Sequence, residues 1–382
     1  MKLIYFDNAA TTKVDERVLK EMSPFFTEKY GNASSSHDFG LGAKDALEKS
    51  RKIIAKSIKA DTDEIIFTSG GTEGNNLALK GLFFANYPKK NHIITTKIEH
   101  DCILQTCKWL ESQGAKVTYL EVDKEGFVNP EDIKKEITDK TFLVSIIHAN
   151  NEIGTIQDLE KIGKICKEKK VLFHTDACQS YTKSPIDVRK FNLDLVTFNS
   201  HKLHGPKGVG AIYIKGGIKI VPLFHGGGHE KELRSGTENV SGIVGFAKAV
   251  DISDEKDIKK MEKLRNKLIK GLLEIEKVNL NGPAGAKRLC NNVNVSFNNI
   301  EGEAIGGYLE NCGIYTSTGS ACMSHSLETS HVLKALGLGP LQSNSSLRVS
   351  ISKYTTEEEV DYFLNEIKGI VKKLRRFSPV KI

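Results

Sequence analysis

A lysine stands where an apolar stretch of the chain must end. The segment FNSHKLHGPKG (residues 198–208) places Lys202 just after the apolar run LDLVTF and before a turn rich in Gly and Pro. Gly and Pro mark turns, so one interpretation is a strand end followed by an ordinary polar turn. The other is a lysine positioned to form a Schiff base with a carbonyl cofactor. This segment alone leaves both interpretations open.

Other polar positions follow apolar runs in the same way. After IIFT, the residues Gly71 and Thr72 offer either a phosphate cradle or ordinary capping of a helix. After HIITTKIE, His100 is either a helix cap or a catalytic imidazole. After TFLVSIIHA, Asn150 and Asn151 are first of all a turn signal. Each of these signals is weak when it is taken separately.

Asp176 is more informative, because it follows VLFHT, a run expected to be buried on both faces. An aspartate is rarely buried without a partner, so a cationic group is expected opposite it. A phosphate cradle, an imidazole, a buried carboxylate and a lysine together match the needs of pyridoxal phosphate. Those needs are a phosphate clamp, a ring stacker, an anion for the pyridinium nitrogen and an amine.

The elements that must bring these groups together are short β-branched runs alternating with amphipathic helical stretches. The strand candidates are EIIFTS, HIITTK, KVTYLEV, TFLVSIIH, VLFHTDA, LDLVTFNS and GVGAIYIK. Such alternation predicts βαβ units and a mostly parallel sheet. In such a sheet, ligands bind at the carboxyl ends of the strands, which is where the polar residues above are expected to meet.

The chain of 382 residues is long enough for two domains. After GVGAIYIK a glycine-rich loop, HGGGHEKELRSGT, leads to a long charged helix, DEKDIKKMEKLRNKLIKGLLEI, and then to a second set of strands and helices. We place the boundary near residue 250. Residues 15–250 are predicted to form the large domain, and residues 1–14 with 251–382 a smaller α+β domain.

Composition excludes several other classes of protein. The net charge of +7 is spread along the chain without a block of like charge, so no nucleic-acid partner is expected. The N-terminus is too poor in apolar residues for a signal sequence, and no run is long enough to span a bilayer. We therefore expect no membrane partner and a cytoplasmic location.

The seven cysteines contain no CxxC pair, which argues against a disulfide framework or a zinc knuckle. His225 and His229 in HGGGH have no evident third ligand, so we expect no metal site. Cys322 is different, because it lies in STGSACMSHS, a run of small and polar residues that no core would choose. That composition predicts a mobile loop, which suits a nucleophile that visits a cofactor and leaves with its cargo.

Eight ordered motifs, spanning Tyr5 to the last helix, resemble those of the NifS/IscS-type cysteine desulfurases, which are class V aminotransferases dependent on pyridoxal 5'-phosphate. The motifs are FDNAATT, FTSGGTEGNN, EHDCILQTC, HANNEIGTIQD, HTDACQS, NSHKLHGPKG, HGGGHEKELRSGTENV and STGSACMSHSLETSHVLKALG. The resemblance implies an α/β protein of fold type I: a large domain with a seven-stranded, mainly parallel sheet, and a smaller α+β domain. It also implies a homodimer with sites at the subunit interface.

The resemblance further implies conversion of L-cysteine to L-alanine, with the sulfur kept as a persulfide on Cys322. An iron-sulfur scaffold protein or a thiolation acceptor then receives the sulfur, and Cys322 is a candidate for a transient ligand of the iron-sulfur cluster.

Two residues depart from the family pattern. Met323 stands where a small hydroxyl residue is usual, and Cys178 where threonine is frequent. Neither change removes a catalytic group, and we interpret Cys178 as lining the site.

The same resemblance assigns the remaining site residues. Lys202 is the Schiff-base lysine, and His100 stacks on the cofactor ring and acts as acid or base. Arg348 clamps the substrate carboxylate, although an arginine in SSLRVS would otherwise be interpreted as a surface salt bridge. The cofactor contacts are Asp176 at the ring nitrogen; Gln179 at the phenolic oxygen; Gly71, Thr72, Asn199 and His201 at or beside the phosphate, with Ser200 in the same segment; Thr237 from the neighbouring subunit; and Asn151, which also assists Arg348.

Two other functions stay open at this point. An aminotransferase or selenocysteine lyase of the same fold would need no loop that carries sulfur. A pyridoxal-phosphate protein kept as a regulatory or assembly subunit would predict loss of Lys202 or Cys322, and both are present.

Overall fold

The computed structural model describes residues 3–318 and 329–377, and its central feature is a seven-stranded sheet of order β2-β8-β7-β6-β5-β3-β4. β8 runs antiparallel to β2 and β7, and the other strand pairs are parallel. This confirms the predicted seven-stranded, mainly parallel sheet. The strands are β2 (Ile65–Thr68), β3 (His92–Thr96), β4 (Lys116–Leu120), β5 (Thr141–Ser145), β6 (Leu172–Asp176), β7 (Leu195–Asn199) and β8 (Gly210–Ile214).

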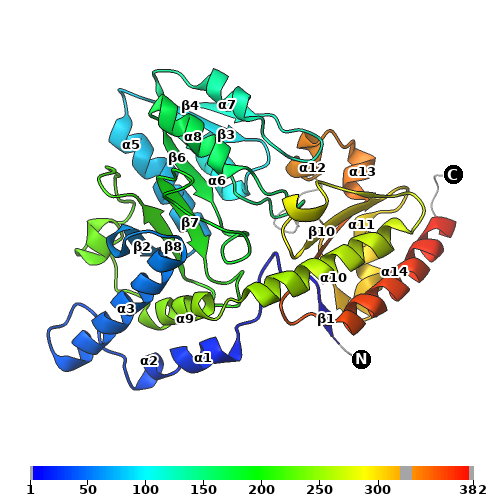
Figure 1. Cartoon of the computed structure of the whole chain (residues 1–382), viewed down its shortest axis with the longest axis horizontal. Helices are drawn as coiled ribbons and strands as arrows, with labels where there is room; N and C mark the ends of the chain where they lie inside the picture. The colour runs from blue at the N-terminus through cyan, green and yellow to red at the C-terminus, as the bar shows by residue number, and fades with distance from the viewer. Residues whose placement is uncertain (1–2, 319–328, 378–382) are drawn as a thin grey trace.

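Helices cover both faces of this sheet, because successive apolar residues of a strand point to opposite faces. Ile65 and Phe67 of β2 pack with α1, α3, α8 and α9, whereas Ile66 packs with the helices that follow β2 and β3. In Figure 1, α3 and α9 lie together below β2 and β8. The helical segments are α1 (Glu16–Met22), α2 (Pro24–Thr27), α3 (Asp38–Ser57), η1 (Thr62–Glu64), α4 (Gly71–Asn76), the π-helical η2 (Leu77–Gly81), α5 (Leu82–Asn86), α6 (Asp101–Ser112), α7 (Pro130–Glu136), α8 (Leu159–Lys169), η3 (His229–Glu232) and α9 (Val240–Asp251).

A second core joins the first residues of the chain to its C-terminal part. Ile4 and Phe6 pack with the helices and strands that follow α9, and both chain ends lie on this side of the molecule (Figure 1). The proposed domain boundaries at residues 14 and 250 stay a prediction. The elements are β1 (Ile4–Tyr5), α10 (Glu255–Leu273), β9 (Val278–Leu280), η4 (Gly285–Lys287), β10 (Asn292–Phe297), α11 (Gly302–Asn311), β11 (Ile314–Tyr315), α12 (His331–Ala335), α13 (Pro340–Asn344), β12 (Ser346–Ser350) and α14 (Glu357–Phe377).

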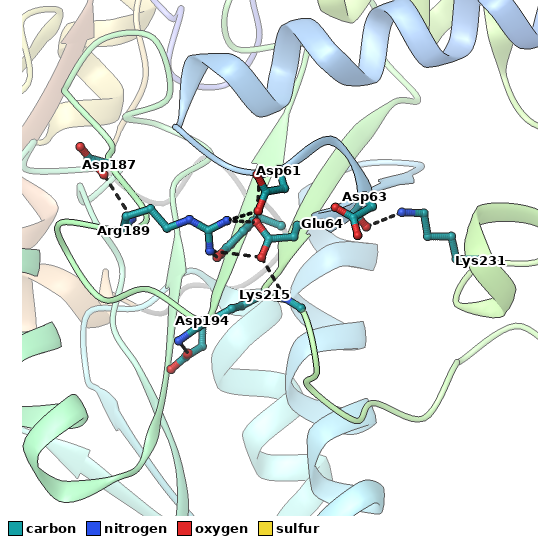
Figure 2. Close-up of polar contacts among 10 residues, drawn as sticks. Asp61, Asp63, Glu64, Asp187, Arg189, Asp194, Lys215 and Lys231 are labelled. Carbon is teal, nitrogen blue, oxygen red and sulfur yellow. Dashed lines mark hydrogen bonds and ion pairs between the residues drawn. The ribbon is translucent and has the colours of Figure 1, made fainter.

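Charged side chains form ion pairs at the edge of the large sheet where β2 and β7 begin and β8 ends (Figure 2). The Nη2 atom of Arg189 lies 2.6 Å from Glu64 Oε2 and 2.7 Å from Asp61 Oδ2. Lys215 pairs with Asp194 at 3.1 Å. These contacts hold together the segments at this edge of the sheet.

None of the helices in residues 3–318 and 329–377 has the length and apolar character needed to cross a membrane.

Candidate active site

A cavity of about 240 Å³ lies at the carboxyl ends of β6 and β7. It brings together residues that are up to 339 positions apart in the chain, from Ala9 to Arg348. Most of the residues predicted as cofactor or substrate contacts line it: Gly71, Thr72, His100, Asn151, Asp176, Gln179, Asn199, His201, Lys202 and Arg348. Their individual roles stay predictions, but these residues do meet at the carboxyl edge of the sheet, as expected.

Asp176 ends β6 and is only 5% exposed. Two N–H donors hold its carboxylate: the main-chain N–H of Cys178 donates to Oδ1 at 2.8 Å, and Asn75 Nδ2 donates to Oδ2 at 2.6 Å. Asp176 is therefore a buried carboxyl group in the cavity lining, held in one orientation by two hydrogen bonds.

Asn75, which sequence reasoning missed, is fully buried and lines the same cavity. It lies four residues after Gly71 in α4, and residues with this spacing share one face of a helix. Asn75 could therefore have been predicted from FTSGGTEGNN, because a polar residue on the same helix face as the predicted phosphate site at Gly71 is expected to point into that site.

His100 caps the N-terminus of α6, where its Nδ1 accepts the main-chain N–H of Cys102 at 3.2 Å. Since Nδ1 accepts, the neutral ring carries its proton on Nε2. Burial, together with the positive charge of Lys202, holds the pKa of His100 below its usual value. His100 is therefore a neutral imidazole that offers an N–H group.

Two thiols also line the cavity. Burial raises the pKa of Cys102 to about 12, and it raises the pKa of Cys178 well above its usual value. The thiolate is the nucleophilic form of cysteine, so both side chains are unreactive at neutral pH. Cys178 lines the site as predicted, and a Cβ atom on Gly71 would lie only 2.5 Å from its sulfur.

The turn that carries Lys202 is braced by the N-terminal segment. Thr12 donates from Oγ1 to the carbonyl of His201 at 2.9 Å, and it accepts the N–H of His204 at the same distance. This contact gives a physical role to the end of the FDNAATT motif. Ser200 is fully buried under the turn, where a Cβ on Gly205 would come within 2.0 Å of Ser200 Oγ, and it is not among the residues lining the cavity.

Arg348 lies in the middle of β12 with its side chain only 4% exposed, so the surface salt bridge that SSLRVS suggested is wrong. Its Nη2 donates to Asp7 Oδ1 at 2.8 Å, and its Nη1 donates to the carbonyl of Asn151 at 3.2 Å. Nε is buried and has no hydrogen-bond partner within the part of the chain that the structure describes. A guanidinium held in this way can still receive a carboxylate.

The wall of the cavity nearest α12 was not predicted from the sequence. Ser330 donates to Glu152 Oε2 at 2.6 Å, and His331 Nε2 donates to the carbonyl of Glu99 at 2.9 Å. Ser330, His331 and Glu152 all line the cavity. Cys322 and Met323, the predicted persulfide carrier and its neighbour, lie outside the described residues.

Thr237 is exposed and borders a different, smaller cavity with Ser69 and Gly208. Two ion pairs anchor its loop: the buried pair of Arg51 with Glu230 at 2.7 Å, and Arg234 with Glu73 at 3.0 Å. Its role toward a neighbouring subunit stays a prediction.

The histidines of HGGGH do not form a metal cluster with other ligand side chains. Over residues 3–318 and 329–377, no group of three or more His, Cys, Asp or Glu side chains is arranged to hold a metal ion.

A doubly covered α/β sheet with a lysine and a buried aspartate in one cavity at its carboxyl edge is the architecture of a fold type I transferase. The profile of the Aminotransferase class-V family matches residues 4–363. A protein of Clostridium botulinum named cysteine desulfurase IscS is 50% identical over 384 residues, covering 99% of this chain and 97% of its own length. The chain belongs to the class-V aminotransferase family, within its NifS- and IscS-type cysteine desulfurases.

Solved structures agree with this placement. A protein described as NifS-like superimposes with a TM-score of 0.92 at 45% identity, over 98% of this chain and all of its own. A structure described as SspA in complex with cysteine gives a TM-score of 0.84 at 38% identity, over 92% of this chain and all of its own.

Proposed function

We propose that this chain is a pyridoxal-phosphate-dependent cysteine desulfurase. It converts L-cysteine to L-alanine and takes the sulfur as a persulfide on Cys322, from which an iron-sulfur scaffold protein or another acceptor receives it. The observation that carries the proposal is the single cavity in which Lys202, Asp176, His100 and Arg348 converge. The related structure described as a complex with cysteine supports the choice of substrate.

The residues of the cavity fit pyridoxal phosphate, which when bound supplies an electron sink for chemistry at the substrate Cα. Lys202 would hold its aldehyde carbon, Asp176 its ring nitrogen and Gln179 its phenolic oxygen. A buried anion keeps a proton on a nearby ring nitrogen. The phosphate end would lie against Gly71, Thr72 and Asn199, which line the cavity where α4 begins and β7 ends, and the first main-chain N–H groups of α4 can donate to an anion there.

The protein's own groups orient the substrate. Arg348, held by Asp7 and by the Asn151 carbonyl, lines the cavity, and its guanidinium would bind the substrate carboxylate and so fix the amino acid relative to Lys202. His100 offers an N–H at Nε2, because Cys102 occupies its Nδ1. The neutral ring of His100 therefore donates a hydrogen bond into the cavity through Nε2.

The sulfur transfer balances without another reactant. The Cys322 thiolate attacks the substrate sulfur, an S–S bond forms, and the Cβ–S bond breaks with its electron pair remaining on the carbon. Protonation of that carbon gives alanine, and Cys322 keeps the second sulfur. Cys102 and Cys178 cannot replace Cys322, because burial keeps both thiols protonated.

The purified protein, given pyridoxal phosphate, L-cysteine and a thiol reductant, should release alanine and sulfide in equal amounts. An aminotransferase of the same fold would instead release a keto acid without sulfide. A regulatory subunit would release neither product, and either result would replace the present proposal.

Arg348→Lys should raise the KM for L-cysteine about tenfold or more, since a lysine cannot form the paired hydrogen bonds of a guanidinium. Steady-state kinetics would measure it, with cofactor absorbance showing that the site is otherwise intact. The matched control is Arg189→Lys, at the opposite edge of the sheet, which should leave KM unchanged. An unchanged KM in Arg348→Lys would remove this residue from substrate binding.

The active form in this proposal is a homodimer in which Thr237 reaches the cofactor phosphate of the partner. It is supported by the exposure of Thr237 and by its absence from the residues that line the cavity of Lys202. Thr237→Asp would place a negative charge beside that phosphate, and Lys202→Ala removes the amine, so each homodimer should be inactive.

Co-expression of the two variants distinguishes shared sites from separate ones. A mixed dimer has one site with both an intact Lys202 and an intact Thr237, so random pairing should restore about a quarter of the wild-type activity. If Thr237 served the site of its own chain, no mixed dimer would be active. Sedimentation of the same samples would show whether the active species is a dimer.

A further inference from the structure

Lys183, in the turn that follows β6, contacts both segments that carry the predicted cofactor residues. Its Nζ donates to the main-chain carbonyl of Gln179 at 3.0 Å and to that of Lys202 at 2.9 Å. Gln179 belongs to the segment after β6, whereas Lys202 belongs to the turn after β7. One ammonium group therefore joins two neighbouring strand ends directly behind the cavity.

The surroundings of Lys183 do not favour a positive charge, so its presence there points to a role for its two hydrogen bonds. Burial lowers the pKa of Lys183 to about 8, and the positive charge of Lys202 acts in the same direction. Among the described residues its hydrogen-bond partners are these two neutral carbonyls and not a carboxylate. Lys183 is half-buried, and a partly desolvated cation without a counter-ion destabilises a protein, a cost that an apolar side chain of similar size would avoid.

The two carbonyls belong to Gln179 and Lys202, which both line the cavity, so a shift of either main chain would move a residue of the cofactor site. Gln179 lines the cavity with its side chain, which also donates to the carbonyl of Ala9 at 2.9 Å. The Lys202 turn is held at His201 and His204 by Thr12, but the carbonyl of Lys202 itself is held by Lys183. We propose that Lys183 is a positioning residue that fixes Gln179 and Lys202 relative to each other and so sets the geometry of the cofactor site. This inference rests on the proposed function.

The charge of Lys183 also acts on the site. Lys202, His201 and Cys178 face it from the side of the active-site cavity, and His204 and Cys290 from neighbouring segments. A small second cavity of about 40 Å³ behind Lys202 is lined by Lys183 together with Asp254, Asp257 and Lys353. Since a positive charge disfavours protonation nearby, removing it should change how the bound cofactor titrates.

Lys183→Met tests the inference, because it removes both hydrogen bonds and the charge while keeping a side chain of similar length. The dissociation constant for pyridoxal phosphate, measured by fluorescence titration of the apoprotein, should rise about tenfold, as expected for the loss of hydrogen bonds from a charged donor. The pH at which the visible absorption of the bound cofactor changes should rise by about half a unit. Lys183→Arg, which keeps charge and donors, should recover most of both values.

The matched control is Lys190→Met, which removes a surface lysine paired with Glu160 and should change neither value. If Lys183→Met lowers the melting temperature of apoprotein and holoprotein equally and leaves both cofactor measurements at wild-type values, Lys183 supports the fold only, and the inference is wrong. If Lys183→Met yields no folded protein, Lys183→Gln, which removes the charge but keeps an N–H donor, is measured instead. A raised dissociation constant or a raised absorption midpoint, with the wild-type melting temperature of the apoprotein, supports positioning, whereas wild-type values of both cofactor measurements overturn it. A wild-type protein that binds no pyridoxal phosphate would overturn the proposed function instead.

Discussion

Cys322→Ser should lose the formation of alanine and sulfide from L-cysteine by a factor of about a thousand or more, while still binding pyridoxal phosphate with the wild-type absorbance. A thiol with a pKa near 8.5 is already a few per cent thiolate at neutral pH, whereas a serine hydroxyl is hardly ionised and cannot hold a persulfide. Lys202, Asp176 and His100 are unchanged in this variant, so cofactor binding should not suffer. Product assays and absorbance spectra on the same preparation measure both parts of the prediction.

A second measurement locates the sulfur. Wild-type protein given L-cysteine without reductant should gain one sulfur atom on the peptide that contains Cys322, as seen by mass spectrometry. Cys312→Ser is the matched control, because Cys312 lies in the C-terminal part of the chain and does not line the cavity. It should behave as the wild type. Retention of the wild-type rate of alanine release in Cys322→Ser would exclude the proposed mechanism.

Lys202→Ala should lose activity completely and should not form a covalent adduct with pyridoxal phosphate on borohydride reduction. Its fold should survive, because the contacts of this turn with Thr12 and Lys183 use main-chain atoms that alanine keeps. Mass spectrometry of reduced, digested wild-type protein should place the adduct on Lys202.

Lys207→Ala is the control for this variant, since Lys207 is exposed and lies in the same segment. It should keep both the adduct and the activity. The informative alternative is Lys183, a half-buried lysine that lines a small cavity together with Lys202. An adduct on Lys183, or on any other lysine, would show that the cofactor lysine has been wrongly assigned.

The sheet and the edge that carries chemistry could be predicted because both depend on local patterns. Runs of β-branched residues marked the strands, and Asp176 and Lys202 were conspicuous as polar residues directly after such runs. The same reasoning placed His100 at the start of a helix, where the structure has it.

Contacts between distant segments could not be predicted in this way. Asp7 binds Arg348 across 341 residues, and Thr12 braces His201 across 189. The periodicity of a sequence does not reveal a partner so far along the chain. From SSLRVS alone Arg348 was therefore interpreted as a surface residue, whereas in the structure β12 pairs with β10 and Arg348 is buried. Lys183 was missed for a related reason, because its partners are main-chain carbonyls and carry no side-chain signature.

The close approach of Gly71 to Cys178 restricts how this site can evolve. Since a Cβ at position 71 would lie 2.5 Å from the sulfur of Cys178, the two positions cannot vary independently. Alanine at 71 is compatible with the present backbone only after position 178 has become smaller or has moved. The order in which positions 71 and 178 are substituted therefore matters.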